Sequence, residues 1–151
     1  MGFPFTTQDR VTVVTSRPVS AEDVLGAIAQ SLQDENQAES VTPLGEGEMI
    51  IRPPFGGGND GGNVLGGLSE LRVTVDPTDA GVTVLLLRRL PAPFYLAAPI
   101  LAAGAVRLLR LDPLWYAGAP LIVVASLWLG DLSNRASLRA RVRRVVTRAG
   151  G

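Results

Sequence analysis

Apolar and polar residues alternate along the first ninety positions in patterns that predict a small α+β domain. The segment RVTVVTS, Arg10 to Ser16, is rich in β-branched residues and predicts a strand. Ser20 is a good N-cap for a helix that follows, and Glu22 and Asp23 place negative charge in its first turn. The apolar residues of this amphipathic helix recur at helical spacing: Val24, Leu25, Ile28, Ala29 and Leu32.

Three further strands are expected after the polar loop QDENQAES. The segment EGEMIIRP, Glu46 to Pro53, predicts one strand, which the Pro53-Pro54 pair ends. A hairpin follows, with its turn at Asp76 to Gly81 and alternating apolar positions on both strands: Leu71, Val73, Val75, Val82, Val84 and Leu86. The expected order is β-α-β-β-β, and residues 1–90 are expected to form one cytoplasmic domain.

Two uncharged segments then predict a transmembrane helical hairpin over residues 91–130. Leu90 to Val106 has seventeen residues without charge, and Pro113 to Gly130 has eighteen, each close to the minimum that crosses a bilayer as a helix. Aromatic residues stand near the ends of both segments, as in interfacial belts: Phe94, Tyr95, Trp115, Tyr116 and Trp128. A buried helical hairpin in a soluble oligomer is the alternative.

Residues 131–151 predict a basic amphipathic tail. Its apolar face consists of Leu138, Val142, Val145 and Val146. Such a helix directly after a span is expected to lie among anionic headgroups, so five arginines are interpreted as membrane-surface residues: Arg139, Arg141, Arg143, Arg144 and Arg148. Nucleic acid is not an expected partner, because no aromatic residues interleave these arginines.

The charge distribution adds an orientation. Residues 1–90 hold six Arg and twelve Asp or Glu, whereas residues 91–151 hold eight Arg and two Asp. Eight arginines stand near the outer ends of the two segments and only Arg107 and Arg110 stand between them, so both termini are expected in the cytoplasm and the hairpin in a cell inner membrane. All fourteen basic residues are Arg, which we interpret as the codon bias of a GC-rich, bacterial genome.

The composition argues against catalysis. The chain contains no His and no Cys, which removes the side chain that titrates near neutrality and the usual transition-metal ligands. No catalytic, metal or cofactor site is predicted. Gly56, Gly58 and Gly61 match the dinucleotide pattern G-x-G-x-x-G, but Pro53-Pro54 separates them from the strand and more glycines follow where a helix should begin. We interpret this stretch as a flexible connection whose apolar residues pack or touch the membrane: Phe55, Val64, Leu65 and Leu68.

One feature of the first apolar segment suggests helix association. Ala98, Ala102 and Ala105 recur at helical spacing and form a small-residue strip that lets another helix approach closely. The sequence therefore favours a non-catalytic, membrane-anchored accessory or adaptor protein, with membrane lipids and other membrane-protein subunits, or a second copy, as partners. The rival hypothesis is a membrane-tethered module that senses a lipid or small molecule. A membrane enzyme that uses carboxylates such as Glu46 and Glu48 is the third.

Overall fold

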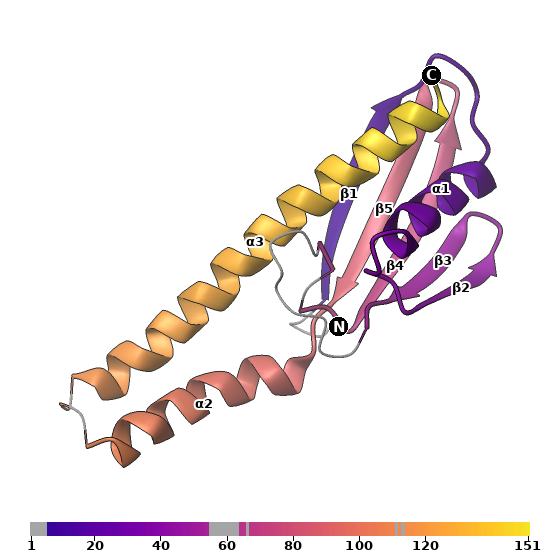
Figure 1. The fold of residues 1–151 in the computed structure, drawn as a ribbon. Coiled ribbons are helices and arrows are strands. Elements are labelled where there is room, and N and C mark those ends of the chain that lie inside the picture. The colour runs from indigo at the N-terminus through magenta and orange to yellow at the C-terminus, as the bar shows by residue number, and fades with distance from the viewer. Residues whose placement is uncertain (1–5, 55–63, 66, 111, 113) are drawn as a thin grey trace. The chain divides into compact units, whose positions relative to one another are not determined.

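The structure is a computed structural model that describes residues 6–54, 64–65, 67–110, 112 and 114–151 (Figure 1). Among these residues it contains five strands and three helices, which confirms the α+β class. In chain order the elements are β1 (Thr6–Val14), α1 (Ala21–Gln33), β2 (Ser40–Gly45), β3 (Glu48–Arg52), β4 (Glu70–Thr78), β5 (Gly81–Arg89), α2 (Ala92–Leu108) and α3 (Trp115–Ala149).

The strands form one sheet in the order β1-β5-β4-β3-β2, and every neighbouring pair is antiparallel. The first strand therefore joins the sheet beside the last one, with Val11 opposite Val84. Residues that lie directly opposite each other point to the same face of the sheet. Apolar residues at alternate positions of β1, β3, β4 and β5 consequently gather on one face.

That face carries the hydrophobic core. Helix α1 and the C-terminal half of α3 lie over the same side of the sheet (Figure 1), and their apolar residues belong to one cluster with those of the strands. The helical members are Val24, Leu25, Ile28 and Leu32 of α1 with Leu138, Val142 and Val146 of α3. Complete burial of such a side chain contributes roughly 1.5–3 kcal/mol, so the end of α3 is a structural part of this fold.

Helix α1 begins where the sequence predicts it. The Ser20 hydroxyl oxygen accepts a hydrogen bond from the Asp23 amide at 3.1 Å, and Ser20 is the N-cap residue with an extended backbone. The predicted face, which includes Val24 and Ile28, is buried. Capping and periodicity, both local signals, were sufficient for this element.

Strand β2 corrects the expected order to β-α-β-β-β-β. The sequence assigned no strand to residues 40–45, yet Ser40–Gly45 pairs with β3 at the edge of the sheet. Pro43 is tolerated because an edge strand needs no amide donor on its outer side. Gly47 closes the turn to β3 with φ +78°, and a Cβ there would lie 2.9 Å from the Val75 carbonyl oxygen.

The two-helix transmembrane hairpin is supported only in part. Within the described residues one helix, α3, is long and apolar enough to cross a membrane, whereas α2 has seventeen residues and its described apolar part is shorter. Helix α3 has thirty-five residues and runs from Trp115 through the predicted end of the second span to Ala149. The expected tail is therefore helical, but it continues α3 and does not begin a separate helix.

The chain divides into two compact units. One, here the sheet unit, comprises residues 1–90 and 134–151; the other, here the apolar unit, comprises residues 91–133. The sequence placed the boundaries differently, at 1–90, 91–130 and 131–151. The grouping of residues 134–151 with the sheet follows from the burial of Leu138, Val142 and Val146 in its core.

Candidate functional site

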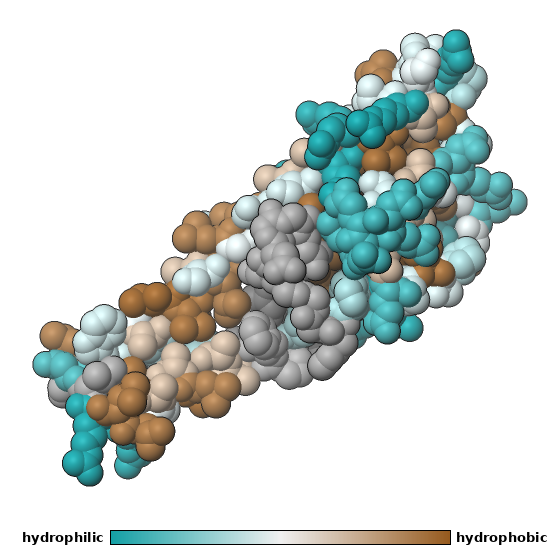
Figure 2. Space-filling model, viewed as in Figure 1, coloured by the Kyte–Doolittle hydropathy of each residue, from teal (hydrophilic) through white to brown (hydrophobic). Residues whose placement is uncertain are grey.

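The surface of the apolar unit is the most unusual feature of the described residues. Large apolar side chains are exposed along α2 and the first half of α3, where brown atoms gather in Figure 2. They are Leu96, Ile100, Leu101, Leu108, Leu109, Leu114, Trp115, Tyr116, Leu121, Ile122, Val124, Trp128, Leu129 and Leu132. The sheet unit exposes only three such residues within its described part: Val14, Leu44 and Leu87. Exposed apolar surface of this extent marks contact with a membrane or another protein.

The exposed apolar stretch of α3 has the length of a membrane span. Trp115 to Gly130, the uncharged part of α3, covers about 24 Å of helix at 1.5 Å per residue, somewhat less than the roughly 30 Å hydrocarbon core. Trp115 and Tyr116 are exposed near one end, and Trp128 is exposed near the other. The predicted aromatic pair Phe94 and Tyr95 lies outside the side chains that the structure describes.

The predicted small-residue strip lies on α2 inside the apolar unit. Ala98 and Ala102 are half-buried and Ala105 is exposed. Val106, next to the strip, is buried. The strip is thus open enough for contact with another helix, and the packing role assigned to it remains a prediction.

The five arginines predicted at the membrane surface fall into two groups. Arg139 lies 4.0 Å from an Asp9 carboxylate oxygen, and Arg141 donates to Glu35. The remaining three arginines are exposed, and within the described part of the chain they form no ion pair: Arg143, Arg144 and Arg148. Two arginines of the set therefore stabilise the sheet unit internally, and three face solvent.

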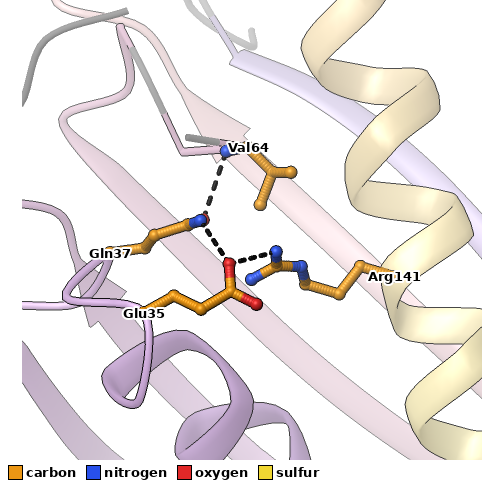
Figure 3. Close-up of polar contacts among 4 residues, drawn as sticks. All are labelled: Glu35, Gln37, Val64 and Arg141. Atoms are coloured by element: carbon orange, nitrogen blue, oxygen red, sulfur yellow. Dashed lines mark hydrogen bonds and ion pairs between the residues drawn. The ribbon is translucent and has the colours of Figure 1, made fainter. Parts of the chain in front are cut away.

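A polar cluster joins α3 to the loop after α1 (Figure 3). Glu35 Oε2 accepts from Arg141 at 2.5 Å and from Gln37 Nε2 at 2.9 Å, and Gln37 Oε1 accepts from the Val64 amide at 3.2 Å. Gln37 is buried, and the Arg141 side chain is 14% exposed. These three hydrogen bonds link the segment at Val64 to the loop after α1 and to α3.

The sequence did not anticipate the buried polar residues Gln37, Arg88 and Asp131. Arg88 is 0% exposed and faces the core side of β5 in register with Val82, Val84 and Leu86. The sequence contained a signal for the burial of Arg88, because every second residue of a strand points to the same face and Arg88 follows Val82, Val84 and Leu86 at this spacing. A buried Arg needs a partner for its charge, and Arg88 makes at least one polar, ring or electrostatic contact.

The glycine stretch lies mostly outside the described residues, which leave out 55–63 and 66. Val64, Leu65 and Leu68 are described and belong to the core of the sheet unit. The sequence left open whether these apolar residues pack in the domain or touch the membrane. Val64, Leu65 and Leu68 pack in the core, and Phe55 lies outside the described residues. Gly67 adopts φ +76°, a conformation that favours glycine.

The candidate carboxylates have ordinary surroundings. Glu46 is exposed, and Glu48 lies 3.2 Å from Arg72 and accepts from the Thr74 hydroxyl at 3.4 Å. No three His, Cys, Asp or Glu residues of the described part come together as metal ligands. Comparison of the sequence with protein families and with curated proteins finds no match.

Proposed function

We propose that this protein is a non-catalytic, membrane-anchored adaptor whose apolar unit lies in the bilayer and whose sheet unit lies in the cytoplasm. The observation that carries the proposal is the apolar surface exposed by α2 and the first half of α3. In water this surface would be costly, because apolar area contributes about 25 cal/mol per Å² when it is removed from water. In the hydrocarbon core of a bilayer this cost does not arise, even where no protein partner covers the surface.

In this proposal α2 is the second membrane crossing. Its seventeen residues span about 26 Å, at the lower end of what crosses a bilayer. Arg89 precedes it and Arg107 lies near its end, and long cationic side chains reach the interface from slightly inside it. Local thinning of the bilayer compensates for a short helix at modest cost.

The orientation of the proposal follows from the arginines. Cytoplasmic flanks of membrane spans carry an excess of Lys and Arg. Residues 131–151 hold six arginines, whereas the connection between α2 and α3 holds Arg110 with Arg107 just before it. The sheet unit is therefore proposed on the cytoplasmic side of an inner membrane, and the α2–α3 connection on the opposite side.

The adaptor role rests on the Ala98, Ala102 and Ala105 strip. Helices in lipid gain little hydrophobic energy from association, so they depend on close backbone approach at small residues. Glu48 is engaged by Arg72, and Glu46 is solvated, so neither carboxylate carries a reaction in this proposal. The partner is a transmembrane helix of a larger membrane complex or of a second copy.

Accessibility to a thiol reagent tests the anchoring and orientation. The chain has no Cys, so single cysteines at Ser40, Arg110 and Thr147 report one position each. In sealed cells a membrane-impermeant reagent should label only the variant at Arg110. Labelling at Ser40 or Thr147, or recovery of the chain in the soluble fraction, would contradict the anchored orientation.

A matched pair of double variants tests the adaptor role. Ala98→Leu with Ala102→Leu should release the protein from its membrane partners while it stays inserted, because the added side chains block close approach. Ala97→Leu with Ala103→Leu adds the same volume to other positions of α2 and should release nothing. Copurification from gently solubilised membranes measures both. Equal retention of every partner by both pairs would contradict docking through the strip.

A further inference from the structure

Strand β1 is the outermost strand at one edge of the sheet (Figure 1). Outside the ladder to β5, its main-chain groups form no hydrogen bond with any described residue. In an antiparallel pair every second residue directs its N–H and C=O away from the neighbouring strand, so the outer side of β1 is a row of open donors and acceptors. We propose that residues 10–14 bind an extended segment of a partner protein, which joins the five-stranded sheet as a further antiparallel strand. This inference concerns the sheet unit alone and does not depend on the proposed anchoring.

The opposite edge of the sheet is protected against such pairing, whereas β1 is not. Strand β2 has six residues, contains Pro43, and its register with β3 shifts between Pro43 and Gly45. Short length, proline and bulges are the devices that keep an edge strand from pairing with another chain. Strand β1 has nine residues without Pro, Gly or Lys, all in continuous register with β5. Its inward-pointing charge, Asp9 opposite Leu86, protects only the first half, so residues 10–14 are the open part of this edge.

The side chains of residues 10–14 define what the partner segment carries. Val11 and Val13 are 3% and 7% exposed and face the core, so apolar, β-branched residues suit the positions opposite them. Val14 is 79% exposed, more than any other large apolar residue described in the sheet unit, and an apolar residue opposite would cover it. Arg10 is exposed and forms no ion pair with a described residue. An acidic residue therefore belongs opposite Arg10.

A second copy of this chain fits the edge less well. Residues directly opposite each other in an antiparallel pair point to the same face of the sheet. Asp9 points to the core face and Arg10 to the other face, so no antiparallel register of β1 with itself places these two charges opposite each other. The register that pairs the two buried valines of one copy with those of the other leaves Arg10 opposite Val14. The charge on Arg10 thus favours a partner segment with an acidic residue of its own.

Binding of a synthetic peptide tests strand addition. The probe is a fluorescent peptide that contains the run Val-Val-Thr-Val-Glu, the antiparallel complement of residues 10–14, and it is titrated against the full-length protein in neutral phosphatidylcholine nanodiscs. Two versions of the peptide are N-methylated at alternate amides. One version should bind at least about tenfold more weakly than the other, because only one blocks the amides that face β1. Equal binding of the two versions, or no saturable binding of the unmodified peptide, would overturn the inference.

Exchange of charge tests the register. Arg10→Glu should weaken binding of the Glu peptide about threefold, and strengthen binding of the same peptide with Lys in place of Glu by a similar factor, as expected for one exposed cross-strand ion pair. The control variant, Arg144→Glu, makes the same charge change at another exposed Arg of the sheet unit. It should leave the ratio of the two affinities as in the parent. An equal change of this ratio in both variants would show that net charge alone attracts the peptide, against the inference.

Single cysteines test for a second copy at the edge. The chain has no Cys, so Thr12→Cys places one thiol on β1 and Thr42→Cys places one on the protected strand β2. The two variants should form disulfide-linked dimers equally slowly on oxidation, and both should bind the peptide. A dimer that forms rapidly with Thr12→Cys alone would assign the edge to a second copy and overturn the inference. The same titrations apply in buffer to a chain that proves soluble, so failure of strand addition and failure of the proposed anchoring are distinguishable.

Discussion

The two halves of α3 show how one helix serves two environments. In the second half Leu138 is 1% exposed and lies in the core of the sheet unit, whereas in the first half Leu129 is 60% exposed. Both are leucines of the same uninterrupted helix. The difference arises from their neighbours, because the second half has a sheet to cover its apolar stripe and the first half has none among the described residues.

The comparison shows that the placement of apolar and charged residues around the helix differs between the two halves, as expected if their surroundings differ. Apolar residues of the second half occupy one stripe, with arginines elsewhere, as expected for a helix that packs against a sheet in water. Residues 115–130 carry no charge on any side, a distribution that is typical of a helix surrounded by apolar material. A paired set of substitutions in the two halves tests this interpretation.

The largest effect is expected from truncation of the two leucines. Leu138→Ala should lower the free energy of unfolding of the sheet unit by about 2–5 kcal/mol, since it removes buried methyl groups and leaves a cavity. Leu129→Ala should change it by less than about 0.5 kcal/mol. Hydrogen exchange of the β5 amides in the reconstituted protein measures both values. Similar losses in the two variants would remove the distinction between the halves.

Substitution of two glycines by alanine should change stability by an intermediate amount, with a loss at Gly150 and a gain at Gly130. A Cβ on Gly150, just after α3, would lie 2.6 Å from the Thr15 methyl group, whereas a Cβ on Gly130 would meet nothing within 4 Å. Gly150→Ala should therefore destabilise the sheet unit by about 1–3 kcal/mol through overpacking. Gly130→Ala should stabilise the helix by up to about 1 kcal/mol, because Ala has the higher helix propensity.

Thermal unfolding of the reconstituted protein, followed by circular dichroism, reports the sign of each glycine change. Ser16 donates to the Gly150 carbonyl oxygen at 2.8 Å, so the end of α3 is held closely at this point. A stabilising Gly150→Ala would mean that the contact with Thr15 is looser than the structure indicates.

The smallest change in stability is expected from substitution of two arginines in the second half of α3. Arg141→Gln should destabilise the sheet unit by about 1 kcal/mol, because it weakens a charged hydrogen bond to Glu35 whose carboxylate is half-exposed and partly screened. Arg144→Gln should be close to neutral in the isolated protein. Denaturant titrations measure the free energy of unfolding of both variants at low and high salt. The difference between the two variants should be smaller at high salt, because salt screens the Arg141–Glu35 interaction. A larger loss from Arg144→Gln would contradict its exposed position, in which no described residue forms an ion pair with it.

Local patterns predicted the elements whose signals are local. Ser20 and the periodic apolar residues after it fixed α1, and alternation fixed β4 and β5. Strand β1 begins at Thr6, four residues before its predicted start, because Thr6 to Asp9 pair with Leu86 to Arg89. Strand β2 was missed because its short, polar, Pro-containing segment becomes a strand only through pairing with β3.

The tail shows a different limit of sequence interpretation. Its apolar stripe was visible as Leu138, Val142 and Val146, but a membrane interface and a sheet both offer an apolar surface to such a stripe. The choice depends on the exposed face of a sheet assembled from residues 6–90. The pairing of Arg139 with Asp9 and of Arg141 with Glu35 depends on the same assembly, so the sequence could not separate these two arginines from the other three.

The division of the sheet unit into residues 1–90 and 134–151 also sets an order of events during synthesis. Strands β1 to β5 leave the ribosome first, and the α3 side chains that complete their core follow only after the apolar unit has been made. At about 5–20 residues per second, the sixty residues from Leu90 to Gly150 delay closure by about 3–12 s. During that interval α3 does not yet cover the apolar face of the nascent sheet, so the completion of this core is timed by the translation of the apolar unit.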